Sequence, residues 1–194
     1  MTHREEVTMS RIPVTARQTT FTRFAAWYSR RKYGAVLDPL DVMAHNPRVL
    51  RADAFFEGSV AKWDRLDPQL KLLAVLTSSA TIGCSWCMDF GYWVAHSEGV
   101  PEAKLREIPR WRDSDAYTDV ERLVMTYADA MSRTPMEVDD AMVAALREHL
   151  DDAALVELTM MVAVENQRSR FNSAVGLTGQ GFKDRCELGA GAKA

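Results

Sequence analysis

Apolar residues recur every three or four positions along most of the chain, which is the spacing of one face of an α-helix. The first such stretch ends at Gly34 and is aromatic: Phe21, Phe24, Trp27 and Tyr28. We interpret these side chains as a packing stripe. Helices are expected over residues 39–44 and from 47 to about 63, because Asn46 can cap the second one and Pro47 suits its first turn.

The same start signal recurs at Asp67 and Pro68, and it predicts the central helix of the fold. Apolar residues cover more than one face of this segment, which is typical of a buried helix. They are Leu70, Leu72, Leu73, Leu76 and Ala80. Residues 84–98 are predicted to be helical after a glycine, and a short helix is expected from Pro101 to about residue 108.

Two sequences match a capping box, in which a Thr and a Glu three residues later each satisfy a free backbone N–H of the other. One pairs Thr118 with Glu121, and the other pairs Thr134 with Glu137. They predict helices over residues 119–132 and 135–149.

A last long helix is expected from a cap at Asp151 to Gly176, and residues 177–194 are expected to be irregular. No stretch shows the alternation of a β-strand, so the predicted fold class is all-α. The predicted organisation is a basic N-terminal extension over residues 1–35, one helical domain over 36–182 and a tail over 183–194.

Composition agrees with a globular helical protein, since 47% of the 194 residues are hydrophobic and only 10 Gly and 7 Pro are present. The net charge of −3 is divided unevenly. Residues 1–33 carry seven Arg or Lys against two Glu, which leaves the rest of the chain acidic. We interpret the basic segment as a solvated or partner-covered extension, and no nucleic-acid partner is expected.

No stretch approaches the ~20 apolar residues that a membrane span needs, and no secretory leader is evident. We therefore expect a cytoplasmic protein without a membrane partner. The three cysteines do not form a secreted disulfide framework. Two of them form the motif Cys84-Ser-Trp-Cys87, which in a reducing compartment indicates redox or metal chemistry.

The spacing of Cys84 and Cys87 suits a dithiol that closes to a disulfide, because residues three apart on a helix lie on nearly the same face. A helix N-terminus favours the thiolate over the thiol. On this argument alone Cys84, which lies nearer the helix end, is the better nucleophile.

The motif has two other interpretations. The cysteines can be simple buried apolar residues, or they can bind zinc. A zinc site needs two further ligands, for which the candidates are His45, His96, His149 and Cys186. His96, nine positions after Cys87, does not complete a site by local geometry, and no metal or cofactor is expected. Cys186 is interpreted as incidental.

Several of these segments resemble the carboxymuconolactone decarboxylase family, and more narrowly its alkylhydroperoxidase D-like branch. The resemblance rests on the stretch that opens at Leu66-Asp-Pro, on the Cys-x-x-Cys motif at a helix start, and on Glu165-Asn-Gln-Arg-Ser-Arg-Phe-Asn172. It covers about residues 36–182. It implies an all-helical domain that assembles as a trimer or hexamer and reduces peroxides through a cysteine sulfenic acid.

The resemblance also assigns roles to the two cysteines. Cys87 matches the cysteine that peroxide attacks, and Cys84 matches the partner that supplies a proton and closes the disulfide. The family's proton relay is missing, because its His and Glu positions hold Gly91 and Leu72 here. Gly91 either leaves room for a bulkier substrate or permits close helix packing. Restoring the pair with Gly91→His and Leu72→Glu is expected to raise the peroxide reaction rate.

The leading hypothesis is therefore a thiol-dependent peroxidase, an antioxidant oxidoreductase with Cys84 and Cys87 as catalytic residues. His96 and Glu165 are the candidate surrogate bases. Its partners are a hydroperoxide substrate, an external thiol reductant and further copies of the chain. One alternative is a lactone decarboxylase or isomerase on the same fold, and another is a relay-deficient accessory or binding protein.

Overall fold

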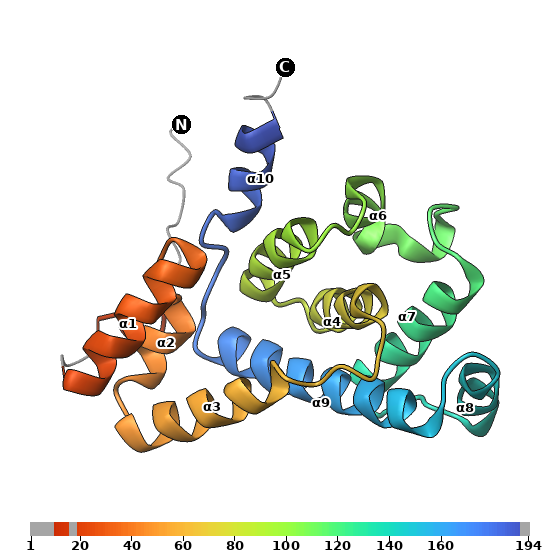
Figure 1. Cartoon of the computed structure of the whole chain (residues 1–194), viewed down its shortest axis with the longest axis horizontal. Coiled ribbons are helices and arrows are strands. Elements are labelled where there is room, and N and C mark those ends of the chain that lie inside the picture. The colour runs from red at the N-terminus through yellow and green to blue at the C-terminus, as the bar shows by residue number, and fades with distance from the viewer. Residues whose placement is uncertain (1–9, 16–18, 191–194) are drawn as a thin grey trace, which may run out of the picture. The chain divides into compact units, whose positions relative to one another are not determined.

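A computed structural model describes residues 10–15 and 19–190, and every regular element in those ranges is a helix. The chain forms two compact units, one of residues up to 62 with 174–178, and the other of residues 63–173 with those from 179 onward. None of the helices in the described ranges is long and apolar enough to cross a lipid bilayer. Figure 1 shows the helices in chain order.

The first unit contains three helices that begin and end close to the predicted positions. They are α1 (Thr20–Tyr33), α2 (Asp38–Met43) and α3 (Pro47–Val60). Asn46 caps α3 as expected, since its side chain accepts from the backbone N–H groups of the next turn. Gly34 ends α1 with a φ of 73°, in the left-handed region that suits glycine. Most of the basic extension before α1 lies outside the described residues.

The second unit holds the cysteine motif. Its helices are α4 (Pro68–Ile82), α5 (Ser85–Ser97), α6 (Glu102–Glu107), the 3-10 helix η1 (Ile108–Asp113), α7 (Asp119–Ser132), α8 (Asp140–Arg147), α9 (Asp152–Ala174) and α10 (Phe182–Ala190). Figure 1 shows α4 between α5, α7 and α9. The predicted central helix is therefore confirmed.

The apolar residues of α4 separate two hydrophobic clusters. Leu70 and Ala74 pack with residues of α7, α8 and α9, while Leu73 and Leu76 pack with residues of α5, α6, η1 and α7. Because α4 is apolar on more than one face, it can fill both clusters at once. This arrangement fixes the end of α4, and with it the start of the cysteine helix.

The helix expected over residues 135–149 begins later than predicted. Thr134 and Glu137 do not form a capping box: the Thr134 hydroxyl accepts from Arg170, and the Glu137 N–H donates to the carbonyl of Ala130 at 3.0 Å. Asp139 caps α8 instead, by accepting from the N–H of Met142 at 2.8 Å. Partners outside the local sequence therefore override the local capping signal.

The irregular end expected after residue 176 is wrong for residues 182–190, which form α10. A carboxylate far away in the sequence stabilises the start of this helix. Asp89 of α5 accepts from the backbone N–H groups of Gln180, Phe182 and Lys183 at 2.6–3.0 Å. Residues 191–194 of the predicted tail lie outside the described residues.

Candidate active site

The cysteine motif lies at the junction between the end of α4 and the start of α5. Gly83 ends α4 with a φ of 80°, and the N–H of Cys84 donates to the carbonyl of Ser79 at 3.0 Å. Cys84 is the N-cap of α5, and its Sγ accepts from the N–H of Cys87 at 3.2 Å. Both cysteines are buried and reduced. The prediction that the motif opens a helix is confirmed.

The two sulfurs share one proton unequally. A hydrogen bond from the Cys87 thiol, aided by the Cys87 backbone N–H, lowers the pKa of Cys84 to about 7. The same hydrogen bond raises the pKa of the Cys87 thiol, and burial raises it further. Cys84 is therefore the sulfur that holds negative charge near neutral pH, as the helix-end argument predicts.

A polar face of α9 lies against the sulfurs. The Glu165 carboxylate, only 3% exposed, accepts from Ser79 and Ser169 at 2.8 and 2.7 Å through Oε1. Ser169 also lowers the pKa of both cysteines. One turn further along, the Nδ2 of Asn172 donates to the Sγ of Cys87 at 3.3 Å.

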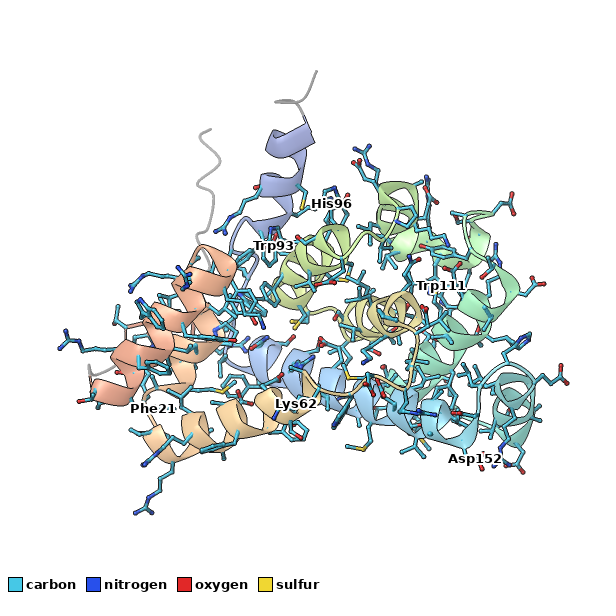
Figure 2. All side chains as sticks on the ribbon, in the orientation of Figure 1. Phe21, Lys62, Trp93, His96, Trp111 and Asp152 are labelled. Atoms are coloured by element: carbon cyan, nitrogen blue, oxygen red, sulfur yellow. The ribbon has the colours of Figure 1, made fainter. Side chains whose placement is uncertain are left out.

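Of the predicted site residues, the structure brings together Cys84, Cys87 and Glu165. It does not bring His96 to them. His96 lies in the last turn of α5, and nine residues of helix separate it from Cys87 by about 13 Å along the axis. Figure 2 shows His96 one turn beyond Trp93 on that helix. Direct proton transfer between His96 and these sulfurs is therefore excluded within one chain.

Sequence reasoning missed three groups around the sulfurs: Ser79, Ser169 and Asn172. A signal for two of them is present in the sequence. Glu165, Ser169 and Asn172 are spaced four and three apart, which places polar side chains on one face of a helix that is otherwise packed. Ser79 gives no such signal, because it is one of several neighbouring hydroxyl residues, Thr77 and Ser78 among them, and nothing in the spacing singles it out.

Gly91 serves helix packing. It is buried in α5, and a Cβ on it would lie 3.0 Å from the Cδ2 of Leu76, which leaves no room for a substrate there. Leu72 packs against the hydrophobic cluster that contains Leu76. Restoring the relay with Gly91→His would therefore force a ring into the α4–α5 contact. The variant is expected to lose stability and to gain no peroxidase rate.

Aromatic rings pack along the side of α5 that faces α10. Phe90 stacks on Trp86 and Trp93 with ring centroids 5.1 and 5.9 Å away, and Phe182 of α10 meets Phe90 edge-on at 5.1 Å. The indole N–H of Trp86 donates to Gln180 at 3.2 Å. These rings bind α10 to α5 and form part of the packed interior.

The structure gives the remaining cysteine no place in this cluster. Cys186 lies on α10 and packs against the hydrophobic cluster of Leu73 and Leu76. In the ranges that the structure describes, no three His, Cys, Asp or Glu side chains are arranged to hold a metal ion. The chemistry that this site offers is that of a dithiol with a carboxylate and an amide beside it.

Comparison with known proteins places this arrangement in a family. Residues 31–130 match the model of the carboxymuconolactone decarboxylase family. The chain is 35% identical over 176 residues to YnjA of Escherichia coli K12, which is 90% of this chain and 93% of YnjA.

Solved structures share the fold at lower identity. An uncharacterized peroxidase-related protein of Ralstonia eutropha JMP134, described as an alkylhydroperoxidase AhpD core, is 21% identical with a TM-score of 0.78, over 90% of this chain and 95% of that one. The debrominase Bmp8 is 20% identical with a TM-score of 0.78, over 89% and 95%, and is also known in complex with 2,3,4-tribromopyrrole. The chain therefore belongs to the carboxymuconolactone decarboxylase family and has the alkylhydroperoxidase D-like fold.

Proposed function

We propose that the protein is a thiol-dependent peroxidase that reduces hydroperoxides with Cys84 and Cys87. One observation carries the proposal: two reduced, buried cysteines share a proton in the first turn of α5, and the pKa of one of them is lowered to about 7. A dithiol that is part thiolate at neutral pH has both the nucleophile and the resolving thiol that peroxide reduction needs.

The hydrogen bond between the two sulfurs assigns them different roles, with Cys87 as the nucleophile and Cys84 as the base and resolving thiol. The Cys84 thiolate takes the proton of the Cys87 thiol while the Cys87 sulfur attacks the distal oxygen of the hydroperoxide. The O–O bond breaks, the alkoxide receives that proton from Cys84, and Cys87 becomes a sulfenic acid. The Cys84 thiolate then attacks the Cys87 sulfur, and hydroxide leaves and is protonated by solvent. The disulfide that results is returned to the dithiol by an external thiol.

The relay His and Glu of the family have no counterpart at Gly91 and Leu72, and the Cys84 thiolate supplies a base without them. Cys84 is in direct contact with the Cys87 thiol, which is the group that loses its proton. A separate His or Glu base would have to act through Cys84. A turnover that depends on this single ionisation is expected to rise as the pH passes through about 7.

A count of free thiols tests the proposal. Treating the reduced protein with cumene hydroperoxide is expected to lower the count from three to one, and peptide mapping is expected to find Cys84 linked to Cys87. Three persistently free thiols would contradict it. In the Cys84→Ser variant a dimedone adduct on Cys87 is expected, and an adduct formed only at Cys84 in the reverse variant would exchange the two roles.

Reductive debromination is a second candidate, because the same dithiol can deliver two electrons to a carbon–bromine bond. Bromide leaves, the carbon takes up one proton in its place, the second thiol proton goes to solvent, and the two sulfurs form the disulfide. The fold that the chain shares with the debrominase Bmp8 favours testing it. Treatment with 2,3,4-tribromopyrrole in place of hydroperoxide separates the two functions. Loss of thiols with the pyrrole but not with hydroperoxide supports debromination. If neither compound lowers the thiol count, an accessory protein or a lactone-processing enzyme is supported.

A further inference from the structure

Asn172 carries a polar atom for which the site offers no partner. The side chain is 2% exposed, and its Nδ2 donates to the Cys87 sulfur at 3.3 Å. Its Oδ1 is buried and has no hydrogen-bond partner among the described residues. A buried carbonyl oxygen without a donor destabilises the fold, so such atoms mark places where water or a ligand completes the site.

The distances allow one ligand atom to contact both Oδ1 and the Cys87 sulfur. The oxygen and nitrogen of one amide are about 2.2 Å apart, so Oδ1 lies within about 5.5 Å of the Cys87 sulfur. One oxygen atom can therefore contact both, at about 3.2 Å from the sulfur and about 2.8 Å from Oδ1. An O–H group in that position donates to Oδ1 while its oxygen faces the sulfur.

We propose that Asn172 is a substrate-binding catalytic residue, with Nδ2 holding the Cys87 sulfur and Oδ1 accepting the O–H of a hydroperoxide. This inference rests on the proposed peroxidase function and names the feature of the substrate that the site recognises. The distal oxygen of a hydroperoxide carries the only hydrogen of the O–O group. It is also the oxygen that passes to sulfur.

The same hydrogen bond lasts through the reaction. When the Cys87 sulfur attacks the distal oxygen, the O–O bond breaks and the alkoxide leaves with the proton that Cys84 received from Cys87. The transferred oxygen keeps its own hydrogen, and the sulfenic acid S–O–H still donates to Oδ1. The amide therefore orients the peroxide before the step and the sulfenic acid after it, with the second sulfur three residues away to resolve it.

Two oxidants separate substrate binding from thiol activation. Cumene hydroperoxide has an O–H donor, whereas diamide oxidises dithiols and has neither O–H nor N–H. In Asn172→Leu, which keeps the side-chain size and removes both polar atoms, the rate constant with cumene hydroperoxide is expected to fall about 100-fold. The rate constant with diamide is expected to fall less than about 10-fold, because only the contact of Nδ2 with sulfur is lost.

Asn172→Asp supplies the conservative variant, because it keeps an acceptor at the position of Oδ1. Its ratio of hydroperoxide rate to diamide rate is expected to stay closer to that of the wild type than the ratio of Asn172→Leu. Where Asn172→Leu fails to fold by circular dichroism, Asn172→Ala takes its place. An equal loss of rate with both oxidants, or no loss with hydroperoxide, overturns the inference.

Asn166 provides a matched control, since it lies on the same helix and its Nδ2 donates to Ser132 and Val162 and not to sulfur. Asn166→Leu is expected to leave the ratio of the two rates unchanged. If the wild type reacts with hydroperoxide and Asn172→Leu has the same ratio of hydroperoxide rate to diamide rate, the role of Asn172 is overturned and the proposed peroxidase function stands. A wild type that reacts with diamide but with no hydroperoxide overturns the proposed function and the assignment of Oδ1 together.

Discussion

The charge on Cys84 results from groups that act in opposite directions. The thiol and backbone N–H of Cys87 stabilise the thiolate, while burial and the negative charge of Glu165 oppose it. Glu165 raises the pKa of both cysteines, so it restrains the dithiol and does not act as its electrostatic activator. Its two hydroxyl donors, Ser79 and Ser169, hold the carboxylate beside the sulfurs.

Removing that negative charge is expected to make the dithiol more reactive at lower pH. Thiolate is present above the pKa of Cys84, about 7, so alkylation by iodoacetamide rises through that pH in the wild type. In Glu165→Gln the pKa of Cys84 is expected to fall, which moves the midpoint of the alkylation profile to lower pH. Mass spectrometry of the labelled Cys84 peptide across pH 5–9 measures it.

Glu157→Gln is the control for this measurement. Glu157 is another buried carboxylate of α9, paired with Lys71 and absent from the groups that influence the sulfurs. Its substitution is expected to change stability and leave the alkylation midpoint in place. A midpoint that stays the same or rises in Glu165→Gln contradicts the restraining role of the carboxylate.

Single residues of the site were predictable where their chemistry is local. Cys84 and Cys87 are recognisable because a pair of thiols three residues apart is itself a reactive unit. Glu165 was a candidate base as a charged residue of the last helix that could line the site. Asn172 was not a candidate, because its partner lies 85 residues away. Which polar side chain of α9 meets which sulfur depends on how α9 packs against α4 and α5.

At the scale of elements, the contact between α5 and α10 depends on one carboxylate. Asp89 accepts three backbone N–H groups at the start of α10, which the helix itself cannot satisfy. It replaces the N-cap that normally comes from the residue before the helix. Because Asp89 is two residues after Cys87, the same helix turn carries the dithiol and holds α10 in place.

Asp89→Ala is therefore expected to loosen α10 and to lower the free energy of unfolding by about 1–2 kcal/mol. Hydrogen exchange of peptides covering residues 182–190 is expected to become faster, and urea unfolding measures the loss of stability. Asp139→Ala removes the cap of α8 and serves as the comparison. It is expected to cost stability without changing exchange in α10, and unchanged exchange of α10 in Asp89→Ala contradicts the capping role.

Elements were predictable from the sequence wherever the helix signal and its partners lie in the same segment. Asn46 with Pro47, Asp67 with Pro68, and Thr118 with Glu121 all cap the helices that they were expected to cap. The signal at Thr134 failed because Arg170 of α9 takes that hydroxyl. The helix α10 was not predicted because the groups that stabilise it lie far away in the sequence. Its cap, Asp89, and the aromatic partner of Phe182, Phe90, are both on α5.

At the scale of the whole molecule, self-association remains a prediction. The first unit leaves large apolar side chains of α1 open to solvent: Phe24, Trp27 and Tyr28 are 60%, 56% and 50% exposed. Trp27 and Tyr28 lie three and four residues after Phe24, so the three side chains lie on one side of the helix. A monomer gains nothing from an aromatic stripe in water, whereas a second copy of the chain can cover it.

Light scattering coupled to gel filtration is expected to find a homo-oligomer, and the resemblance implies a trimer or hexamer. Trp27→Glu places a charge in the middle of the stripe and is expected to shift the mass toward the monomer, because burying that carboxylate at an interface without a partner is costly. Arg48→Glu changes the charge of an exposed residue on α3, outside the stripe, and is expected to leave the mass unchanged. A wild-type protein that runs as a monomer at micromolar concentration contradicts the prediction. An oligomer that survives Trp27→Glu shows that a surface other than α1 forms its interface.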